Sequence, residues 1–415
     1  NNDGQTVQQW TGLAPIASTP YLLPGGELLR PCRVQPPPPM TGAAYGGRVQ
    51  RFAFDGTLLW EYRRTFPEGA GIGRGHLRSL AIWQDLVFVA TLDASLVALD
   101  ARTGDVVWET QIADYRQGYS NSAGPIVVDG KVINAINGCS RFQPDSCFIT
   151  AHDARTGEEL WRTLTIAQPG SPGGDTWGDL SLTLRGGGDS WITGSYDPEL
   201  GLTYWGVAQA KPWSQASRTT DGDALYTNST LALDPDTGEI VWYYQHLAND
   251  QWDLDSAFER QIVTIPFEGK SRKAVINMGK LGILDAVDAA TGEYLFSMDM
   301  GLQNVVSAID PDTGYKTINP YTIPQLEETR LICANHYGAK SWPPAAFNPN
   351  TNRLYLPLNE GCIEAGPDGR YEILTTGVQM REALLPDSNG RMGRIQALDL
   401  GNQEFDWLHR QPSPV

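Results

Sequence analysis

Short apolar runs separated by polar turns recur along the chain. The clear copies share an apolar strand end, an Asp, a Thr-Gly turn and a second strand that closes on an aromatic residue, as in 98-ALDARTGDVVW-108, 151-AHDARTGEELW-161, 232-ALDPDTGEIVW-242 and 286-AVDAATGEYLF-296. Weaker copies stand at 52-FAFDGTLLW-60 and 397-ALDLGNQEFDW-407. The Gly can adopt the positive φ of a tight hairpin turn, and the Asp can accept hydrogen bonds from backbone amides within it. The pattern therefore predicts a series of similar β-hairpins.

The spacing of these copies predicts how the hairpins assemble. They recur at intervals of roughly 50 residues, with one interval of about 80 and another of about 110. One hairpin cannot bury both of its faces, whereas four-stranded blades arranged radially can, with the closing Trp residues docked between neighbouring blades. We therefore predict an all-β fold, a β-propeller that forms a single domain over residues 1–415, with about six recognisable blade units. A solenoid or a sandwich fits this period less well.

Composition supports the prediction and narrows the range of partners. The chain has 44 Gly, 28 Pro and 13 Trp in 415 residues and only 19% charged residues, which favours short strands and turns over long amphipathic helices. A net charge of −17 argues against binding to nucleic acid or to an anionic membrane surface. No apolar run of about 18 residues occurs, so no membrane span is expected. The chain starts at Asn1 without a signal peptide, as a mature protein or a fragment would.

The cysteines bear on the cellular compartment. No two of them form a CxxC pair and few histidines stand near them, which argues against a zinc site. Two disulfides and one leftover thiol are the preferred interpretation, and buried reduced thiols are the alternative. Disulfides would imply a periplasmic or secreted protein. The five residues are Cys32, Cys139, Cys147, Cys333 and Cys362.

The repeat A-x-D-x-x-T-G-x-x-x-W resembles the tryptophan-docking motif of the quinoprotein alcohol dehydrogenases, which use pyrroloquinoline quinone (PQQ) on an eight-bladed propeller. Between residues 76 and 410 six segments follow that family in order, namely 77-LRSLAIW-83, 118-GYSNSAGPIVV-128, 186-GGGDSWITGSYDPELGLTYWG-206, 224-ALYTNSTLALDPDTG-238, 250-DQWD-253 and 338-GAKSWPPAAFNPNTNRLYLPLN-359. The resemblance implies PQQ-dependent oxidation of an alcohol to an aldehyde or ketone. No CxxCH haem motif is present, so the electrons would pass to an external acceptor such as a cytochrome c.

The chain departs from the family in three places. The adjacent-cysteine motif of the family is absent from 71-GIGRGHLR-78, and the chain stops at Val415, where the family would continue into further blades. The segments 20–30 and 46–62 look more like the opening of an arylsulfotransferase-type propeller. We therefore expect an atypical first blade over residues 1–65 and quinoprotein-like blades over 66–415. Six units could form a closed six-bladed ring or an incomplete eight-bladed one.

The resemblance implies catalytic residues in and near the loop after the strand-like run 239-EIVWYYQ-245. Asp253 matches the base that takes the proton of the alcohol hydroxyl. Lys280, in 279-GKLG-282, matches a basic residue that hydrogen-bonds the quinone oxygens and stabilises developing negative charge. An ordinary solvated turn is the alternative for the acidic loop.

The same resemblance implies a PQQ-binding set. A flat quinone with three carboxylates requires an aromatic floor and cationic or hydrogen-bonding walls. Trp191 matches the floor, and Arg78, Ser122 and Asn359 match positions that contact PQQ in the family. A structural or surface role is the alternative for each of them.

The resemblance weakens at the metal. Relatives bind Ca²⁺ or a lanthanide through a Glu, an Asn and the catalytic Asp, which are oxygen ligands suited to hard cations. Arg141 stands at the Glu position and Gln209 at the Asn position, while Asp255 falls where lanthanide-using members place an additional carboxylate. Arg cannot ligate a cation, so one hypothesis is that the Arg141 guanidinium replaces the metal as the electrophile that polarises the quinone. A shifted alignment of the loop around Arg141, which carries an extra residue relative to the family, is the alternative. Asp253, Asp255 and Gln209 are the candidate metal ligands.

The resemblance also implies how the cysteines pair. Cys333 and Cys362 lie at the same separation as a structural disulfide of the family, and Cys139 and Cys147 could close a short loop beside Arg141.

Two other functions compete with an enzyme of this family. One is a non-enzymatic scaffold or assembly propeller that keeps the repeat but binds no quinone, and the other is an arylsulfotransferase-like enzyme. A scaffold would have no reason to retain the inward residues implied above together.

Overall fold

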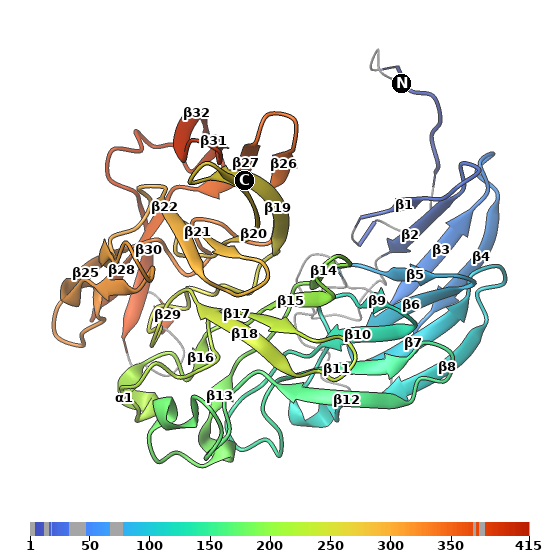
Figure 1. The fold of residues 1–415 in the computed structure, drawn as a ribbon, viewed down its shortest axis with the longest axis horizontal. Helices are drawn as coiled ribbons and strands as arrows, with labels where there is room; N and C mark the ends of the chain where they lie inside the picture. The colour runs from blue at the N-terminus through green and yellow to red at the C-terminus, as the bar shows by residue number, and fades with distance from the viewer. Residues whose placement is uncertain are drawn as a thin grey trace. The chain divides into compact units, whose positions relative to one another are not determined.

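The computed structural model describes residues 5–11, 16–17, 19–32, 47–66, 78–367, 371–372 and 378–414. Strands make up nearly all of the regular structure of these residues (Figure 1), and the all-β prediction is confirmed. Helices within the described part are limited to α1 (Gln215–Arg218) and to the 3-10 turns η1 (Tyr115–Gln117), η2 (Gly174–Trp177), η3 (Leu182–Leu184) and η4 (Pro320–Thr322). No described helix has both the length and the apolar character required to cross a membrane.

The chain divides into two compact units, of which the first comprises Asn1–Cys139, Ile149–Arg162 and Trp191–Thr193. Three four-stranded antiparallel sheets belong to it, each in chain order, and the third extends a few residues past the boundary of the unit. Their strands are β1 (Tyr21–Leu22), β2 (Leu28–Cys32), β3 (Arg48–Phe52) and β4 (Leu58–Arg63); β5 (Ala81–Trp83), β6 (Leu86–Thr91), β7 (Ser95–Asp100) and β8 (Val106–Gln111); and β9 (Ile126–Val128), β10 (Lys131–Ala135), β11 (Phe148–Asp153) and β12 (Glu159–Leu164).

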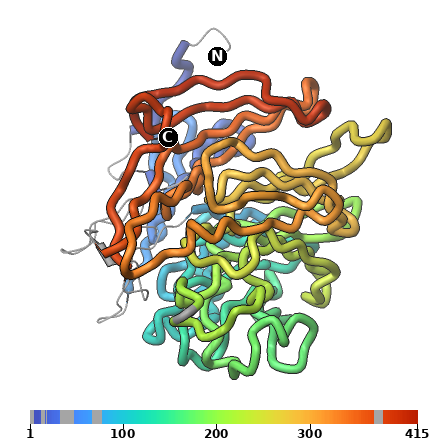
Figure 2. The backbone as a smooth tube through the Cα atoms, turned by 90° about the vertical axis from the view of Figure 1, so that its left-hand side faces the viewer, coloured from blue at the N-terminus to red at the C-terminus, as the bar shows by residue number. Residues whose placement is uncertain are grey.

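The second unit comprises Ser140–Phe148, Thr163–Ser190 and Gly194–Val415. Figure 2 follows it as a series of back-and-forth passes from green to red. Its four-stranded sheets contain β14 (Ser195–Asp197), β15 (Leu202–Gly206), β17 (Ser229–Leu233) and β18 (Ile240–Gln245); β19 (Gln261–Phe267), β20 (Lys270–Met278), β21 (Ile283–Asp288) and β22 (Tyr294–Asp299); β26 (Ala346–Asn348), β27 (Arg353–Asn359), β31 (Gly393–Asp399) and β32 (Glu404–Gln411); and β25 (Arg330–Cys333), β28 (Gly361–Gly366), β30 (Gln379–Leu384) and β29 (Tyr371–Glu372). Two-stranded sheets pair β13 (Gly186–Gly187) with β16 (Ala210–Lys211) and β23 (Val306–Ile309) with β24 (Lys316–Ile318).

The repeat accounts for six of the seven four-stranded sheets found among the described residues. The seventh, made of β25, β28, β30 and β29, carries no copy of the repeat, and its strands alternate along the chain with those of the last repeat sheet. The pattern did not predict it, because its strands pair across long connections and lack the Asp and Thr-Gly turn. A disulfide between Cys333 and Cys362 joins its neighbouring strands β25 and β28.

The turns of the four clear copies have the predicted geometry. Asp100 Oδ1 accepts hydrogen bonds from the backbone amides of Arg102 and Thr103 at 2.8 and 2.9 Å, and Asp153 does the same in the next copy. Gly104 stands at φ +79°, a left-handed backbone conformation that Gly adopts without steric cost. The Asp and the Gly therefore fix the hairpin locally.

The closing Trp of a repeat docks on the turn of the next one within each unit. The Trp60 indole N–H donates to the Ala101 carbonyl at 3.0 Å, and the Trp242 indole N–H donates to the Ala289 carbonyl at 3.2 Å. A Cβ added to Gly292, in the turn under Trp242, would stand 2.6 Å from the Trp ring. The turn glycine is therefore required for the close approach of the Trp as well as for its backbone angle.

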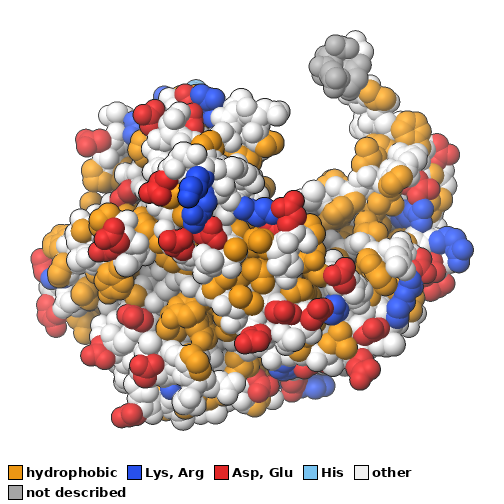
Figure 3. All heavy atoms as spheres, in the orientation of Figure 1, with side chains coloured by type: hydrophobic (Ala, Val, Ile, Leu, Met, Phe, Trp, Pro, Cys, Tyr) orange, Lys and Arg blue, Asp and Glu red, His pale blue; other side chains and the backbone are white. Residues whose placement is uncertain are grey.

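The cores lie between successive sheets. In the first unit the apolar faces of β2 and β3 pack on those of β6 and β7 through Leu29, Val49, Val87, Val97 and Leu99, all of them buried. The second unit has its own apolar core, to which β20, β21, β27 and β31 contribute. Acidic side chains are scattered over the face drawn in Figure 3, in keeping with the net charge of −17.

The cysteines match the prediction of two disulfides and one thiol. Cys139 and Cys147 are disulfide-bonded, as are Cys333 and Cys362, while Cys32 is free and buried. The segment 71–77, in which the adjacent-cysteine motif of the family is missing, lies outside the described residues.

Candidate active site

The loop that follows β18 is organised by its first carboxylate. Asp250 is buried and accepts hydrogen bonds from the backbone amides of Trp252 and Leu254 at 2.7 Å each, and Asn228 donates its side-chain amide to Asp250 at 3.0 Å. Asp253 has a φ of +64°, in the left-handed region that few residues other than Gly, Asn and Asp adopt. Asp250 therefore has a structural role, and it holds a loop in which the backbone of Asp253 is constrained.

The next two carboxylates converge on one ammonium group. Lys280 Nζ lies 3.0 Å from Asp253 Oδ2 and 2.9 Å from Asp255 Oδ2. Gln209 binds the other oxygen of each carboxylate. Its side-chain amide donates to Asp253 Oδ1 at 2.5 Å, and its backbone amide donates to Asp255 Oδ1 at 3.1 Å. Four of the predicted site residues thus meet in one cluster of the second unit.

Burial changes the acid–base properties of this cluster. It raises the pKa of Asp253 well above its ordinary value, and the positive charge of Lys280 offsets this only in part. For Lys280, burial disfavours the charged form, but the carboxylates of Asp253 and Asp255 outweigh it and raise the pKa above its ordinary value. A carboxylate with a raised pKa is a stronger proton acceptor than a solvated one, so Asp253 has the property required of a general base.

A second ion pair adjoins the cluster, and sequence reasoning missed it. Lys211 Nζ lies 2.7 Å from Asp189 Oδ2. Lys211 pairs with Gly186 in the short sheet of β13 and β16, and the Asp189 carbonyl accepts from the Ala208 amide at 2.8 Å. Asp189 is 5% exposed. The signal in the sequence was a charged residue two positions before the predicted floor Trp191 and another two positions after Gln209, but nothing local indicated that they pair.

The predicted PQQ-contacting residues of the first unit also lie together. The Arg78 guanidinium stands 5.0 Å from the centre of the Trp191 ring and donates to the carbonyls of Trp191 and Ser122 at 3.3 Å each. Burial lowers the pKa of Arg78 to about 10. Thr193 Oγ1 accepts from the backbone amide of Gly124 at 3.0 Å and so holds the segment that carries Trp191.

Asn359 is tied to the cluster of the second unit through the backbone. Its amide N–H donates to the Ala339 carbonyl at 2.7 Å, the Ala339 amide donates to the Lys280 carbonyl at 2.8 Å, and the Lys280 amide donates to the Asp255 carbonyl at 2.9 Å. The side-chain amide of Asn359 donates to the Gly338 carbonyl at 3.3 Å. Asn359 therefore lies beside the segment that positions Lys280.

Arg141 has partners of a different kind. Its guanidinium donates to the carbonyls of Ser217 and Arg218 at 2.7 Å each, at the end of α1. These contacts fix its side chain on the backbone of another segment of the second unit. The proposal that Arg141 acts on the quinone therefore stays a hypothesis based on the alignment.

Three comparisons relate this arrangement to known proteins. A family model described as the glucose/ethanol/alcohol dehydrogenase β-propeller domain, and named for PQQ, matches residues 52–308. The chain belongs to the PQQ-dependent quinoprotein alcohol dehydrogenase family. The β-propeller prediction, made from the repeat, and the resemblance to this family are thereby both confirmed.

Relatives in this quinoprotein family include quinohemoprotein alcohol dehydrogenase ADH-IIG of Pseudomonas putida, which is 33% identical over 390 residues that cover 86% of this chain and 53% of the relative. Quinoprotein alcohol dehydrogenase PedH of Pseudomonas putida is 30% identical over 426 residues, which cover 94% of this chain and 70% of PedH. The solved structure of a europium-containing methanol dehydrogenase has the same fold, with a TM-score of 0.86 at 21% identity over 99% of this chain and 74% of that one. The chain spans about half the length of ADH-IIG.

The described residues around Asp253 and Asp255 do not form an oxygen cage for a hard cation. Among the described residues, the one group of three metal-capable side chains with close ligand atoms is Cys139, Cys147 and Asp189, and both cysteines are disulfide-bonded. Asp253 and Asp255 contact an ammonium, and the side chain of Gln209 approaches Asp253 with its nitrogen. The set therefore does not fit a Ca²⁺ or lanthanide ion, which takes six or more oxygen ligands as a rule.

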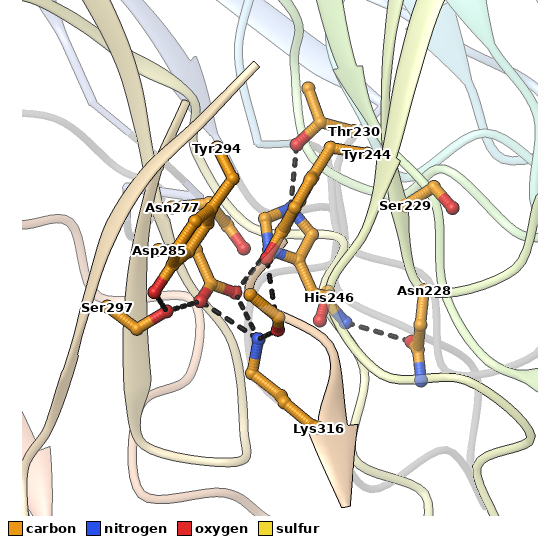
Figure 4. Close-up of polar contacts among 12 residues, drawn as sticks. Asn228, Ser229, Thr230, Tyr244, His246, Asn277, Asp285, Tyr294, Ser297 and Lys316 are labelled. Carbon is orange, nitrogen blue, oxygen red and sulfur yellow. Dashed lines mark hydrogen bonds and ion pairs between the residues drawn. The ribbon is translucent and has the colours of Figure 1, made fainter. Parts of the chain in front are cut away.

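A buried network stands at the start of the loop that follows β18 (Figure 4). His246 Nδ1 lies 2.7 Å from Asp285 Oδ2 and His246 Nε2 lies 2.8 Å from Thr230 Oγ1. Lys316 Nζ contacts both oxygens of Asp285 at 2.9 and 3.0 Å, and Ser297 donates to Asp285 at 2.6 Å. The order Thr-His-Asp resembles a catalytic triad, but Thr230 is 0% exposed, so no substrate can reach it and the network is structural.

The charges of this network follow from its burial. Burial lowers the pKa of His246 to about 4, which leaves the imidazole neutral with its proton on Nδ1. For Asp285 burial favours the neutral acid, but Lys316 and the hydrogen bond from His246 outweigh it and lower the pKa to about 2. The partners of His246 stand 39 and 16 residues away along the chain, so nothing local in the sequence indicates this network.

Proposed function

We propose that this protein oxidises an alcohol to an aldehyde or ketone with PQQ bound. The observation that carries the proposal is the contact of a buried carboxylate of raised pKa, Asp253, with the ammonium of Lys280 at 3.0 Å. When bound, PQQ supplies an electrophilic quinone carbon that accepts hydride. The chain's own residues then have to bind the quinone, orient the alcohol and take its hydroxyl proton.

The contact between Arg78 and Trp191 suits the binding of a planar quinone with three carboxylates. The Arg78 guanidinium over the Trp191 indole offers a cation beside an aromatic face, and Arg is the side chain best matched to a carboxylate. Ser122 and Asn359 are the further residues that we assign to quinone binding. The chemistry of these donors therefore fits PQQ.

We assign the proton transfer to Asp253. One of its oxygens faces Lys280 and the other accepts from Gln209, so the carboxylate is held in one orientation. A base held in this way takes the hydroxyl proton without first having to reorient. Lys280, whose ammonium lies between Asp253 and Asp255, is the donor that we assign to stabilisation of negative charge developing on the quinone oxygens.

The acceptor and the compartment are parts of the same proposal. The two electrons would leave to an external acceptor such as a cytochrome c. The disulfide between Cys333 and Cys362 and the disulfide-bonded Cys139 and Cys147 support a periplasmic or secreted location, because disulfides persist in oxidising compartments.

Reconstitution tests the function directly. The purified protein is mixed with PQQ, and its absorbance and its dye-linked oxidation of primary and secondary alcohols are recorded. Asp253→Asn should abolish turnover and spare PQQ binding, whereas Asp312→Asn, a change at an exposed Asp, should have no effect. Full activity of Asp253→Asn would remove Asp253 as the base, and failure of the wild-type protein to bind PQQ would favour a non-enzymatic propeller.

A further inference from the structure

Every oxygen of the Asp253 and Asp255 carboxylates already has a nitrogen donor from the protein. Lys280 Nζ contacts one oxygen of each at 3.0 and 2.9 Å, and the side-chain and backbone amides of Gln209 contact the other two at 2.5 and 3.1 Å. The side chains of Asp253 and Asp255 are 14% and 7% exposed, so water contributes little to their solvation. The positive charge and the donors that a cation would supply to this pair are therefore present in the chain.

A second lysine is built into the same region. Lys211 follows Gln209 by two residues and ends the short strand β16. The segment is fixed on both sides, because Gly188 donates its amide to the Gln209 carbonyl at 3.1 Å and Ala208 donates its amide to the Asp189 carbonyl at 2.8 Å. Lys211 and its partner Asp189, 2.7 Å apart, are thereby held next to the residue that binds both carboxylates.

The space between the carboxylates of Asp253 and Asp255 is unfavourable for a metal ion. A divalent or trivalent ion between Asp253 and Asp255 would have to displace the Lys280 ammonium, since like charges at such short range repel strongly. Lysine and arginine cannot act as ligands in place of oxygen donors while they carry charge.

We propose that Lys280, reinforced by Lys211, is the resident cation of this site, and that the protein holds its Asp253–Asp255 pair and binds PQQ without a Ca²⁺ or lanthanide ion. The part that concerns PQQ rests on the proposed function, whereas the part that concerns the carboxylate pair does not. Arg141 is not required in this arrangement, because its guanidinium is engaged with the carbonyls of Ser217 and Arg218.

Metal uptake tests the carboxylate part without any quinone. Chelator-treated protein is dialysed against CaCl₂ or LaCl₃, and its bound metal is measured. Asp253→Asn and the double variant Asp253→Asn/Asp255→Asn are the references, because they show how much metal the acidic surface takes up without the intact carboxylate pair. Wild type and both references should hold equal amounts. An excess of one ion per chain in the wild type over either folded reference would overturn the proposal.

Lysine variants test the assignment of the resident charge. Lys280→Met removes the ammonium between the two carboxylates and should gain a specific ion, seen as extra bound metal and as a higher Tm in LaCl₃. Lys211→Met, which removes only the reinforcing charge, should gain a smaller amount. The matched control is Lys273→Met, because Lys273 forms an ion pair of the same length, 2.7 Å, with Asp197 in another part of the second unit. Lys273→Met should behave as wild type. If Lys211→Met takes up no more metal than Lys273→Met, Lys211 has no part in the resident charge.

Quinone binding tests the remaining part. The Kd for PQQ, measured by quenching of Trp fluorescence on chelator-treated protein, should agree within a factor of about two with and without CaCl₂ or LaCl₃. Lys211→Met should bind PQQ about tenfold more weakly and recover with the ion. Binding of PQQ by the wild type only with metal would overturn metal independence, whereas no binding under either condition would overturn the proposed function and leave the dialysis result to decide the metal question.

Discussion

Asp253 and Lys280 lie 3.0 Å apart in the second unit, Asp253 in the loop between β18 and β19 and Lys280 in the connection between β20 and β21. Burial favours the neutral form of Asp253, whereas the neighbouring carboxylates keep Lys280 charged. Without Lys280 the pKa of Asp253 would rise further, and without the two carboxylates burial would lower the pKa of Lys280, because a buried unpaired charge is strongly unfavourable. The pair is therefore the point at which the fold and the proposed chemistry depend on each other.

Replacement of Lys280 by Met should damage both stability and activity. The change leaves Asp253 and Asp255 buried beside each other without their ammonium, and loss of one partner of a buried pair destabilises a protein by about 3 kcal/mol. Turnover should fall by at least about 100-fold. Thermal unfolding and the dye-linked assay measure the two effects.

The control for Lys280 is again Lys273→Met, whose ion pair with Asp197 stands outside the cluster. Its turnover should equal that of the wild type. Unchanged kcat in a folded Lys280→Met protein would show that the ammonium has no role in the reaction.

The His246–Asp285 network should make stability depend on pH in a defined window. Above about pH 6.5 the imidazole is neutral in both the folded and the unfolded chain and contributes nothing. Between about pH 6.5 and pH 4 the imidazole of His246 is protonated in the unfolded chain and neutral in the folded chain, because burial lowers its pKa to about 4. Stability should therefore fall by about 3 kcal/mol as the pH drops through this window, and level off below it.

Denaturant unfolding at pH 7.5 and pH 4.5 measures this effect. His152 and His336 also have pKa values lowered by burial and titrate in the same direction, so the wild-type loss alone does not isolate His246. His246→Gln keeps an amide that can donate to Asp285 but removes the titration, and it should lose less stability than the wild type over the same interval. Equal losses in the two proteins would assign the pH dependence to other groups.

Replacement of Arg78 should weaken quinone binding and leave the stability of the fold nearly unchanged. Arg78→Lys keeps the charge but loses the planar group that stacks at 5.0 Å from the Trp191 ring and can engage a carboxylate through two N–H groups. The Kd for PQQ should rise about tenfold while Tm changes little. Arg116→Lys is the control, because Arg116 stacks on Tyr115 at 5.0 Å on an exposed turn of the same unit. An unchanged Kd in Arg78→Lys would place quinone binding elsewhere.

The repeat shows which parts of this structure the sequence alone could predict. The Asp, Gly and closing Trp act within a hairpin or on the next one, so their chemistry is visible in a short window, and six sheets follow from it. The two disulfides could be anticipated from the number of cysteines and from the family. Asp253, Lys280 and Gln209 came from the family resemblance, and the structure adds the contacts between them.

The remaining interactions depend on pairings that leave no local signal. Lys211 and Asp189 are 22 residues apart, and His246 and Asp285 are 39 residues apart. Each of these side chains would suit a solvated surface equally well, and only the packing of one segment on another selects its partner. The sheet of β25, β28, β30 and β29 was missed for the same reason, because its strands are joined by long connections and not by the repeated turn.

A comparison of two glycines should separate the two reasons for which the repeat requires Gly. Gly292 and Gly269 have nearly the same backbone angle, φ +75° and +74°, but a Cβ at Gly292 would stand 2.6 Å from the Trp242 ring, whereas a Cβ at Gly269 would have no atom within 4 Å. Gly269→Ala should therefore cost only the strain of a left-handed Ala, about 1 kcal/mol. Gly292→Ala should cost about 3 kcal/mol, because it also pushes the docked indole away from the Ala289 carbonyl. Denaturant unfolding of both variants measures the difference, and equal losses would mean that the turn glycines are kept for their backbone angle and not for the docking of Trp.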